Sequence, residues 1–365
     1  MNQKITRLSN IELLRVLAML CIVASHYAVH GLNIYQSAIS RQETIHYILS
    51  IGGGIGVDCF VLVSGYFMVQ SRISMTKISK LLFQIISFSS VFVILAMVVG
   101  APFFEVTIRS ALKSSLGVFG GYWFINAYVG LMMLVPFLNA MIKNMDKKNH
   151  LLCIIVLIMM SSFLPTYMHI PTYVGWLGLF VVLYLIAAYF RLYGVPSYKI
   201  KSIMLALSLV LLGTIGSICI TSRYCAILKP FMYSLLIDRQ ALPIIIISVL
   251  IFAVFVRLHV SYSKIINYAA ASTLGVYLFH EHPLMRDFIW QKVLHTAEAP
   301  FCQSPVLHCI GSIIGVYVVG TIAHIIWQQT IGRLYAPAER FVIIPIYTRM
   351  KKWGNGIIQR IINQS

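Results

Sequence analysis

Two side chains that can do chemistry, Arg15 and His26, lie within the first apolar segment of the chain, NIELLRVLAMLCIVASHYAVHG. An imidazole can act as a general base near neutral pH, and a guanidinium can hold a phosphate group through two hydrogen bonds. The step of 11 residues between them turns a helix through three turns plus about 20°, which puts both on one face, roughly 16 Å apart. The simpler alternative is that Arg15 extends to the lipid headgroups and that His26 is a satisfied interior histidine.

The second and fourth apolar segments also contain polar side chains. In GGGIGVDCFVLVSGYFM, Asp58 follows a run of glycines and precedes Ser64 and Tyr66. A carboxylate in hydrocarbon is costly unless it is paired, and the glycines allow close helix packing, which alone would explain them. The fourth segment opens with GGYWFINAY, which places Trp123 and Asn126 near the membrane surface, where tryptophan also serves as a simple anchor.

A third polar group, formed by His280, Glu281 and His282, stands directly before Pro283 in the segment STLGVYLFHEHPLMRD. Three titratable side chains in succession, in the outer half of an apolar segment, are more than membrane anchoring requires. We therefore expect His280 and Glu281 to contribute to a functional site.

Membrane helices must position these residues, because the composition is not that of a soluble protein. Of the 365 residues, 59% are hydrophobic and only 10% are charged, against about 25% in a soluble domain. Apolar runs of about 20 residues, the length that crosses a bilayer, recur along the chain. We predict an all-α, polytopic helical bundle that forms a single domain over residues 1–365, with residues 332–365 as a basic cytoplasmic tail.

About ten transmembrane helices are predicted, and turn residues separate them. Their approximate ranges are 11–30, 45–69, 78–100, 120–142, 150–165, 175–193, 201–220, 241–257, 267–290 and 306–331. Residues 221–240 are only partly apolar and are expected to form a long loop or a re-entrant segment. The basic residues before the first span resemble a secretory signal, but Arg15 interrupts the apolar run, so we expect this span to be retained.

The distribution of basic residues predicts the orientation. With the N-terminus in the cytoplasm, 19 of the 28 Lys and Arg residues fall in cytoplasmic segments. Eight fall in outer segments: Arg41, Arg109, Lys113, Arg223, Lys229, Arg239, Arg286 and Lys292. Both termini are therefore expected in the cytoplasm. Topology and contact with anionic membrane lipid account for the net charge of +18, and no nucleic-acid binding is inferred.

Taken in order, these segments resemble the acyltransferase-3 family of membrane O-acyltransferases. The resemblance rests first on the pattern E-x-x-R-x10-H at Glu12, Arg15 and His26. It also rests on G-V-D-x-F…S-G-Y at residues 56–66, on WF-x-x-AY at residues 123–128 and on LGVYLFH ending at His280. The resemblance covers most of the chain, which looks like the short type found beside polysaccharide genes of Gram-positive bacteria.

Members of this family carry acyl groups, usually acetyl from cytosolic acetyl-CoA, to hydroxyl groups of surface or lipid-linked glycans. The resemblance implies acetyl-CoA as co-substrate, His26 as general base, and Arg15 and Asp58 as further catalytic residues, with Asp58 able to fix the tautomer of the histidine. Glu12, one turn before Arg15, is expected to orient the guanidinium by pairing with it.

The same resemblance implies binding residues for donor and acceptor. Many relatives carry R-x-x-R after the second span, and here the loop SRISMTKISK keeps the positive charge without the forked geometry of a second guanidinium. The expected contacts to CoA are Arg15, Arg72, Lys77 and Lys80. The expected contacts to the acceptor are Ser64, Tyr66, Trp123, Asn126, His280 and Glu281.

Two other classes of protein remain open on the sequence alone. A transporter of lipid-linked glycans, or a membrane sensor, would also carry intramembrane Arg, Asp and His residues. No internal repeat and no matched pair of interrupted spans favours transport. The seven cysteines are scattered without a CxxC pair, so the sequence indicates neither a metal site nor a disulfide framework. The expected location is the bacterial plasma membrane, and the oligomeric state is left open.

Overall fold

A computed structural model describes residues 8–32, 40–71, 74–100, 103, 104, 107–115, 121–170, 172, 174–196, 198–225 and 228–349. Within these ranges every regular element is helical and no strand occurs. By length and composition, nine helical segments of the described chain can cross a membrane: Ser9–Gly31, Thr44–Met68, Met75–Val99, Trp123–Lys143, Lys147–Tyr167, Gly175–Tyr193, Ile200–Tyr224, Ser234–Arg257 and Pro305–Gln329. The predicted all-α, polytopic membrane bundle is confirmed.

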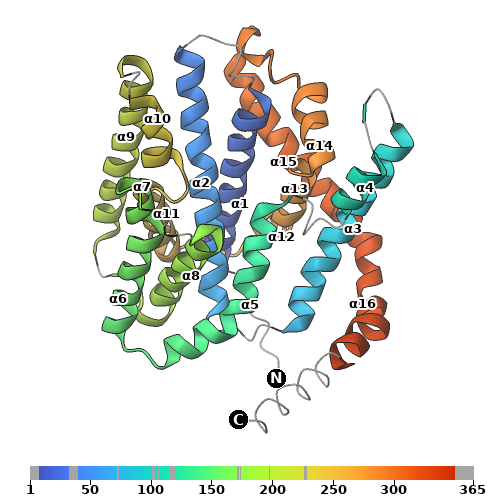
Figure 1. Cartoon of the computed structure of the whole chain (residues 1–365), viewed down its shortest axis with the longest axis horizontal. Helices are drawn as coiled ribbons and strands as arrows, with labels where there is room; N and C mark the ends of the chain where they lie inside the picture. Colours follow the sequence, from blue (N-terminus) through green and yellow to red (C-terminus); the bar gives the residue numbers. More distant parts are fainter. Residues whose placement is uncertain are drawn as a thin grey trace.

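The bundle is built around α1 (Ser9–His26) and α2 (Ser40–Met68), which lie side by side at its centre (Figure 1). The glycines of α2 allow this contact. A Cβ atom on Gly56 would lie only 2.5 Å from the carbonyl oxygen of Ala18, so any other residue would push the two helices apart. Cys59 of α2 in turn contacts the carbonyl oxygen of Ser248 in α11 (Leu242–Arg257), 3.7 Å from its sulfur atom.

The other helices surround this pair in two groups (Figure 1). On the side of α2 lie α6 (Lys147–Ile158), α7 (Leu164–Tyr167), α8 (Gly175–Tyr193), α9 (Ile200–Tyr224), α10 (Lys229–Met232) and α11. On the side of α1 lie α3 (Met75–Val99), α4 (Ile108–Ser115), α12 (Lys264–Ala271), α13 (Thr273–His280), α14 (Pro283–Asp287), α15 (Pro305–Gln329) and α16 (Tyr335–Ala338). Helix α5 (Trp123–Lys143) lies in front of α1 and α2 in this view.

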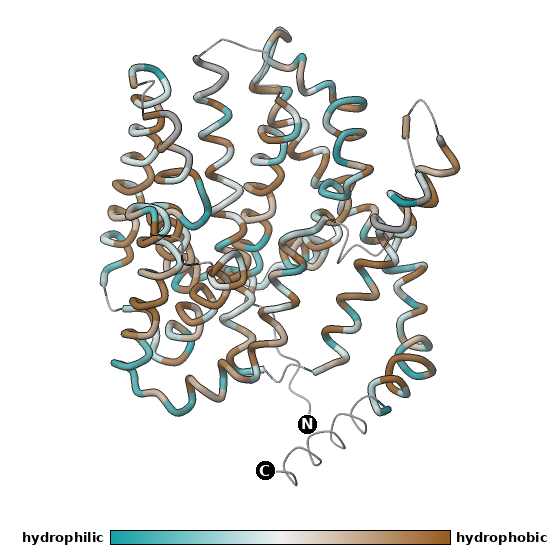
Figure 2. Tube along the Cα trace, viewed as in Figure 1, coloured by the Kyte–Doolittle hydropathy of each residue, from teal (hydrophilic) through white to brown (hydrophobic). Residues whose placement is uncertain are grey.

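Hydrophobic residues are frequent along the peripheral helices (Figure 2), and many large apolar side chains of these helices are exposed, as lipid contact requires. Val98 of α3, Phe137 of α5 and Leu212 of α9 are 80%, 74% and 67% exposed. In water such surfaces would drive aggregation, whereas in a bilayer their exposure to hydrocarbon costs nothing.

The predicted span at 267–290 is not one continuous helix. It is divided into α12, α13, α14 and a π-helical turn at Phe288–Val293. A turn at Ser272 ends α12 against α13, and His282 adopts an extended conformation because the following residue is Pro283. The break leaves His280 and Glu281 at the end of a helix, directed into the bundle and buried.

Two further segments differ in detail from the simple span pattern. The stretch 221–240 contains the end of α9, then α10 and a π-helical turn at Tyr233–Ile237, so it is a short helical connection before α11. After α15, a 3-10 turn at Ile331–Leu334 leads to α16 and a π-helical turn at Glu339–Ile343. The hydroxyl of Tyr335 binds Ser79 and the carbonyl oxygen of Thr76, at 2.9 and 3.0 Å, which fixes this part of the tail to the start of α3.

Candidate functional site

His26 is the last residue of α1, and the chain continues directly into a π-helical turn at Tyr27–Gly31. Its Nδ1 atom lies 2.9 Å from Nε2 of His280 and 3.2 Å from Oε2 of Glu281. His30, in the same turn, places its Nε2 atom 3.3 Å from the same Glu281 oxygen. The structure therefore brings together the end of α1 and the end of α13, and we call His26, His30, His280, Glu281 and Arg286 the histidine–glutamate cluster.

The hydrogen bonds of His280 define the tautomer of His26. Nδ1 of His280 lies 2.6 Å from the carbonyl oxygen of Val276, which can only accept, so this nitrogen carries the proton. Nε2 of the neutral ring is then an acceptor, and it faces Nδ1 of His26. His26 must donate from Nδ1, which leaves its Nε2 atom unprotonated. An imidazole in this state can take a proton from a substrate.

The carboxylate of Glu281 is only 5% exposed and is compensated by charge and hydrogen bonding. Its Oε1 atom accepts from Nη2 of Arg286 at 3.2 Å, and its Oε2 atom faces both His26 and His30. A buried carboxylate with these partners is stabilised in its charged form. It is placed to compensate a positive charge on either imidazole.

Arg15 pairs with Glu12, as the spacing predicts. Nη1 of Arg15 lies 2.9 Å from Oε2 of Glu12, and the guanidinium lies 5.8 Å from the centre of the Phe60 ring. The Arg15 side chain is 20% exposed, whereas Glu12 is 6% exposed. The guanidinium therefore keeps free donors while the buried carboxylate fixes its position.

A narrow apolar cavity lies between the levels of Arg15 and His26. It is lined by Met19, Ile22, Val57, Phe60, Phe124, Leu274 and Tyr277. Met19 and Ile22 follow Arg15 by one and two helical turns on the face that ends at His26. Its walls come from α1, α2, α5 and α13, its volume is about 10 Å³, and neither Arg15 nor His26 lines it.

A model of the acyltransferase domain of the acyltransferase-3 family matches residues 8–325. The chain belongs to this family. It is a multi-pass membrane acyltransferase. Comparisons with curated proteins and with solved structures give no match. The match includes α1 with both Arg15 and His26, and it extends through α13 into α15.

Asp58 of this acyltransferase is fully buried in α2, and neither carboxylate oxygen has a hydrogen-bond partner among the residues that the structure describes. The residues near it are Arg239 and Ser248, on the side of α11. No hydrogen bond or ion pair within the described structure joins Asp58 to His26; the partners of His26 Nδ1 are His280 and Glu281. A catalytic role of Asp58 stays a prediction.

Trp123 forms a cation–aromatic stack with two residues that the sequence does not single out. The guanidinium of Arg239 lies 4.0 Å from the centre of the Trp123 ring and 4.6 Å from that of Trp176. Asn126, one turn along α5, is exposed. This tryptophan–arginine stack offers an aromatic surface and a fixed positive charge at the start of α5 and α8.

The remaining predicted binding residues lie elsewhere. Tyr66 packs against Phe252, and the Arg191 guanidinium lies 4.7 Å from its ring centre, toward the Arg15 end of α2. Ser64, two residues earlier in α2, is buried. Lys77 and Lys80 are exposed in the first two turns of α3, and Arg72 lies outside the described residues. The structure therefore does not bring Ser64 and Tyr66 to the histidine–glutamate cluster.

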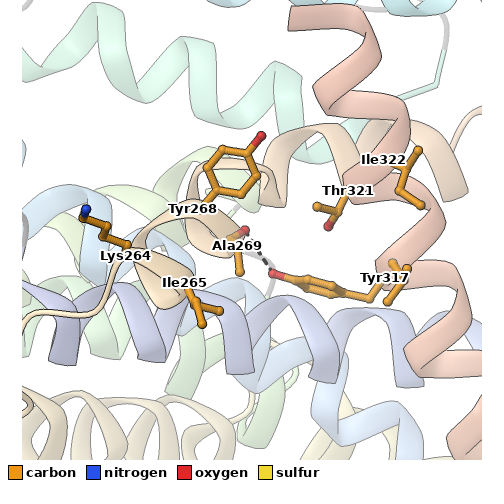
Figure 3. A pocket seen from close by; sticks show the side chains of 8 residues that line it. Lys264, Ile265, Tyr268, Ala269, Tyr317, Thr321 and Ile322 are labelled. Carbon is orange, nitrogen blue, oxygen red and sulfur yellow. Dashed lines mark hydrogen bonds between the residues drawn. The ribbon is translucent and has the colours of Figure 1, made fainter.

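A surface groove of the acyltransferase lies between α12 and α15 and is separate from this cluster (Figure 3). It is lined by Lys264, Ile265, Tyr268, Ala269, Tyr317, Val318, Thr321 and Ile322. The Tyr317 hydroxyl donates to the carbonyl oxygen of Ala269 at 3.2 Å, which holds the two helices together beneath the groove. Ile265 is 82% exposed, as expected of a face toward lipid.

Four residues of the site could not be identified from single motifs: His30, Arg286, Arg239 and Trp176. The spacing of His26 and His30, four residues apart in a helical segment, is a signal that places both imidazoles on one face. Arg286 contacts Glu281, five residues before it, across the break between α13 and α14. Arg239 and Trp176 meet Trp123 through contacts between distant segments, which no local pattern in the sequence indicates.

Proposed function

We propose that the protein transfers an acetyl group from cytosolic acetyl-CoA to a hydroxyl group of a cell-surface or lipid-linked polysaccharide, in the bacterial plasma membrane. Membership of the acyltransferase family supports the reaction class. The observation that carries the proposal is the placement of two groups on one face of α1, about three turns apart: the guanidinium of Arg15, held by Glu12, and the imidazole of His26, whose Nε2 atom is left unprotonated.

Arg15 is the proposed anchor for the CoA phosphates. A guanidinium suits this role because it is always charged and can bind phosphate through two hydrogen bonds. Glu12 holds it in place, and the exposed Lys77 and Lys80 add positive charge at the start of α3. The rise of about 16 Å from Arg15 to His26 is comparable to the reach of an extended pantetheine arm, and the side chains of Met19 and Ile22 between them are apolar.

His26 is the proposed general base. Its Nε2 atom takes the proton of the acceptor hydroxyl while that oxygen forms a bond to the thioester carbonyl carbon. The carbon–sulfur bond then breaks, and the proton passes from Nε2 to the CoA sulfur, which restores the neutral histidine. His280 keeps the proton of His26 on Nδ1 throughout, and Glu281 compensates the positive charge while the ring holds both protons.

The acceptor is proposed to approach from the outer side, where α1 ends. The tryptophan–arginine stack supports this assignment, because aromatic faces pack against the apolar faces of sugar rings and a guanidinium donates hydrogen bonds to sugar hydroxyls. Asn126 extends the same surface by one turn. Membrane lipid surrounds the bundle and would hold a lipid-linked acceptor at this depth.

The test is the O-acetyl content of the surface polysaccharide, measured by nuclear magnetic resonance. The gene is deleted from the producing organism and restored as wild type, His26→Gln or the control His308→Gln. His308 is a histidine of the same region, bound to Tyr27 and to the carbonyl oxygen of Leu294, outside the histidine–glutamate cluster. Acetyl signals should be lost on deletion and restored by wild type and His308→Gln only. An unchanged spectrum after deletion would contradict the proposed function.

A further inference from the structure

We propose that a divalent transition-metal ion of the Zn²⁺ class binds within the histidine–glutamate cluster, at His26, His30 and Glu281, and that it acts as an inhibitor. One ligand atom from each of these residues lies within 4.8 Å of the other two. The inhibitory part of this inference rests on the proposed function, whereas the metal site itself does not.

The donor set and its spacing suit such an ion. Two imidazoles and one carboxylate are ligands that Zn²⁺ accepts, and a tetrahedral site with bonds of about 2.1 Å separates its ligand atoms by roughly 3.4 Å. The Glu281 oxygen lies 3.2 Å from Nδ1 of His26 and 3.3 Å from Nε2 of His30. The nitrogen atoms of the two imidazoles lie within 4.8 Å of each other, so the three residues can surround one ion if the imidazoles move slightly closer together.

The neighbouring residues support the ligands as in known metal sites. Arg286 binds the other oxygen of Glu281 and thereby directs Oε2 to the two imidazoles. Hydrogen bonds of this kind, from residues behind the ligands, orient metal-binding carboxylates. The side chains of His26 and His30 are 16% and 18% exposed, so an ion can reach them. The positive charge of Arg286 weakens cation binding, which fits an inhibitory ion better than a permanent one.

Inhibition follows from the position of one proton. The cluster leaves Nε2 of His26 unprotonated only because Nδ1 carries the proton and donates it to His280. A metal ion on Nδ1 requires a lone pair there, so the single proton of the neutral ring moves to Nε2. The nitrogen that would accept the substrate proton is then occupied, and the hydrogen bond to His280 is lost.

The experiment measures zinc binding to the purified full-length chain in detergent, with Zn²⁺ as the only ligand. Wild type, His30→Gln, Glu281→Gln and the control His308→Gln are titrated in competition with a fluorescent chelator, and bound zinc is counted by elemental analysis. We expect one zinc ion per chain in wild type and in His308→Gln. Affinity should fall by at least about 10-fold in both His30→Gln and Glu281→Gln.

Equal zinc binding by wild type and His30→Gln would overturn the site, as would the absence of bound zinc from wild type. Cysteine or surface carboxylate sites would give the first of these results, because neither variant alters them. The binding curves decide the metal site whether or not acetyl transfer is observed. If transfer occurs and zinc does not bind, only this inference fails. If zinc binds and no transfer occurs, the proposed function fails together with the inhibition that rests on it, and the metal site stands.

Discussion

Glu281→Gln isolates the electrostatic contribution of one carboxylate to catalysis. In the proposed step, His26 becomes positively charged while Glu281 lies 3.2 Å from its Nδ1 atom. Glutamine keeps the size and a carbonyl oxygen at this position but removes the negative charge. His280 remains to define the tautomer of His26, so the substitution should change the energy of the charged imidazole and not its orientation.

The size of the effect follows from the geometry. Two unit charges 3.2 Å apart attract by about 5 kcal/mol at an effective dielectric constant of about 20. Arg286, 3.2 Å from the same carboxylate, offsets part of this attraction, so we take about 3 kcal/mol as the net loss in the transition state. At 1.36 kcal/mol per factor of ten, kcat should fall by about 10²-fold.

The assay is acetyl transfer by purified protein in proteoliposomes, with kcat and the KM for acetyl-CoA measured separately. The matched control is Asp287→Asn, which removes one negative charge from an exposed side chain of the same segment. Glu281→Gln should lower kcat and leave the KM for acetyl-CoA within about twofold, because Glu281 does not contact the proposed donor site. The reasoning is refuted if both variants have similar kcat values, or if Glu281→Gln acts mainly on KM.

Three further predictions test the donor site, the orientation and the packing. Arg15→Lys keeps the positive charge but loses the two parallel N–H donors of the guanidinium, so the KM for acetyl-CoA should rise by roughly 10-fold while the KM for the acceptor stays unchanged. A rise in the acceptor KM alone would place Arg15 on the acceptor side. The exposed Cys302 should react with an impermeant maleimide in intact cells, whereas Ser74→Cys in a Cys302→Ser background should react only after lysis. Labelling of Ser74→Cys in intact cells would invert the topology. Gly56→Ala should lower the unfolding temperature through a clash that costs about 1–3 kcal/mol. The control Gly213→Ala, whose Cβ would meet nothing within 4 Å, should leave that temperature unchanged or raise it; similar shifts would contradict the packing.

Much of the fold follows from the sequence because lipid imposes simple rules on helices. Apolar runs of membrane-spanning length predict the helices, and the helical repeat alone places Arg15 and His26 on one face. The pairing of Glu12 with Arg15 follows from the same repeat and is confirmed. The interruption at Ser272 was not predicted, because hydropathy is continuous there and the break depends on how α13 packs against α15.

The site is harder to predict, because its contacts join distant parts of the chain. Acceptor binding by His280 and Glu281 stays a prediction, and their contacts with Nδ1 of His26 could not be predicted from the sequence. The role of Asp58 in fixing the histidine tautomer stays a prediction; in the structure, Nε2 of His280 faces Nδ1 of His26. Periodicity reports which face a residue occupies on its own helix, and it carries no information about which helix lies opposite.

The central claim is that Nε2 of His26 accepts the proton of the acceptor hydroxyl. It is tested most directly by transfer of radiolabelled acetyl from acetyl-CoA to the organism's own polysaccharide in proteoliposomes, comparing wild type with His26→Gln. Binding of acetyl-CoA is measured on the same preparations. We predict a rate lower by about 10²–10⁴-fold in His26→Gln with acetyl-CoA affinity retained. A near-wild-type rate in a folded His26→Gln protein that still binds acetyl-CoA would contradict the account.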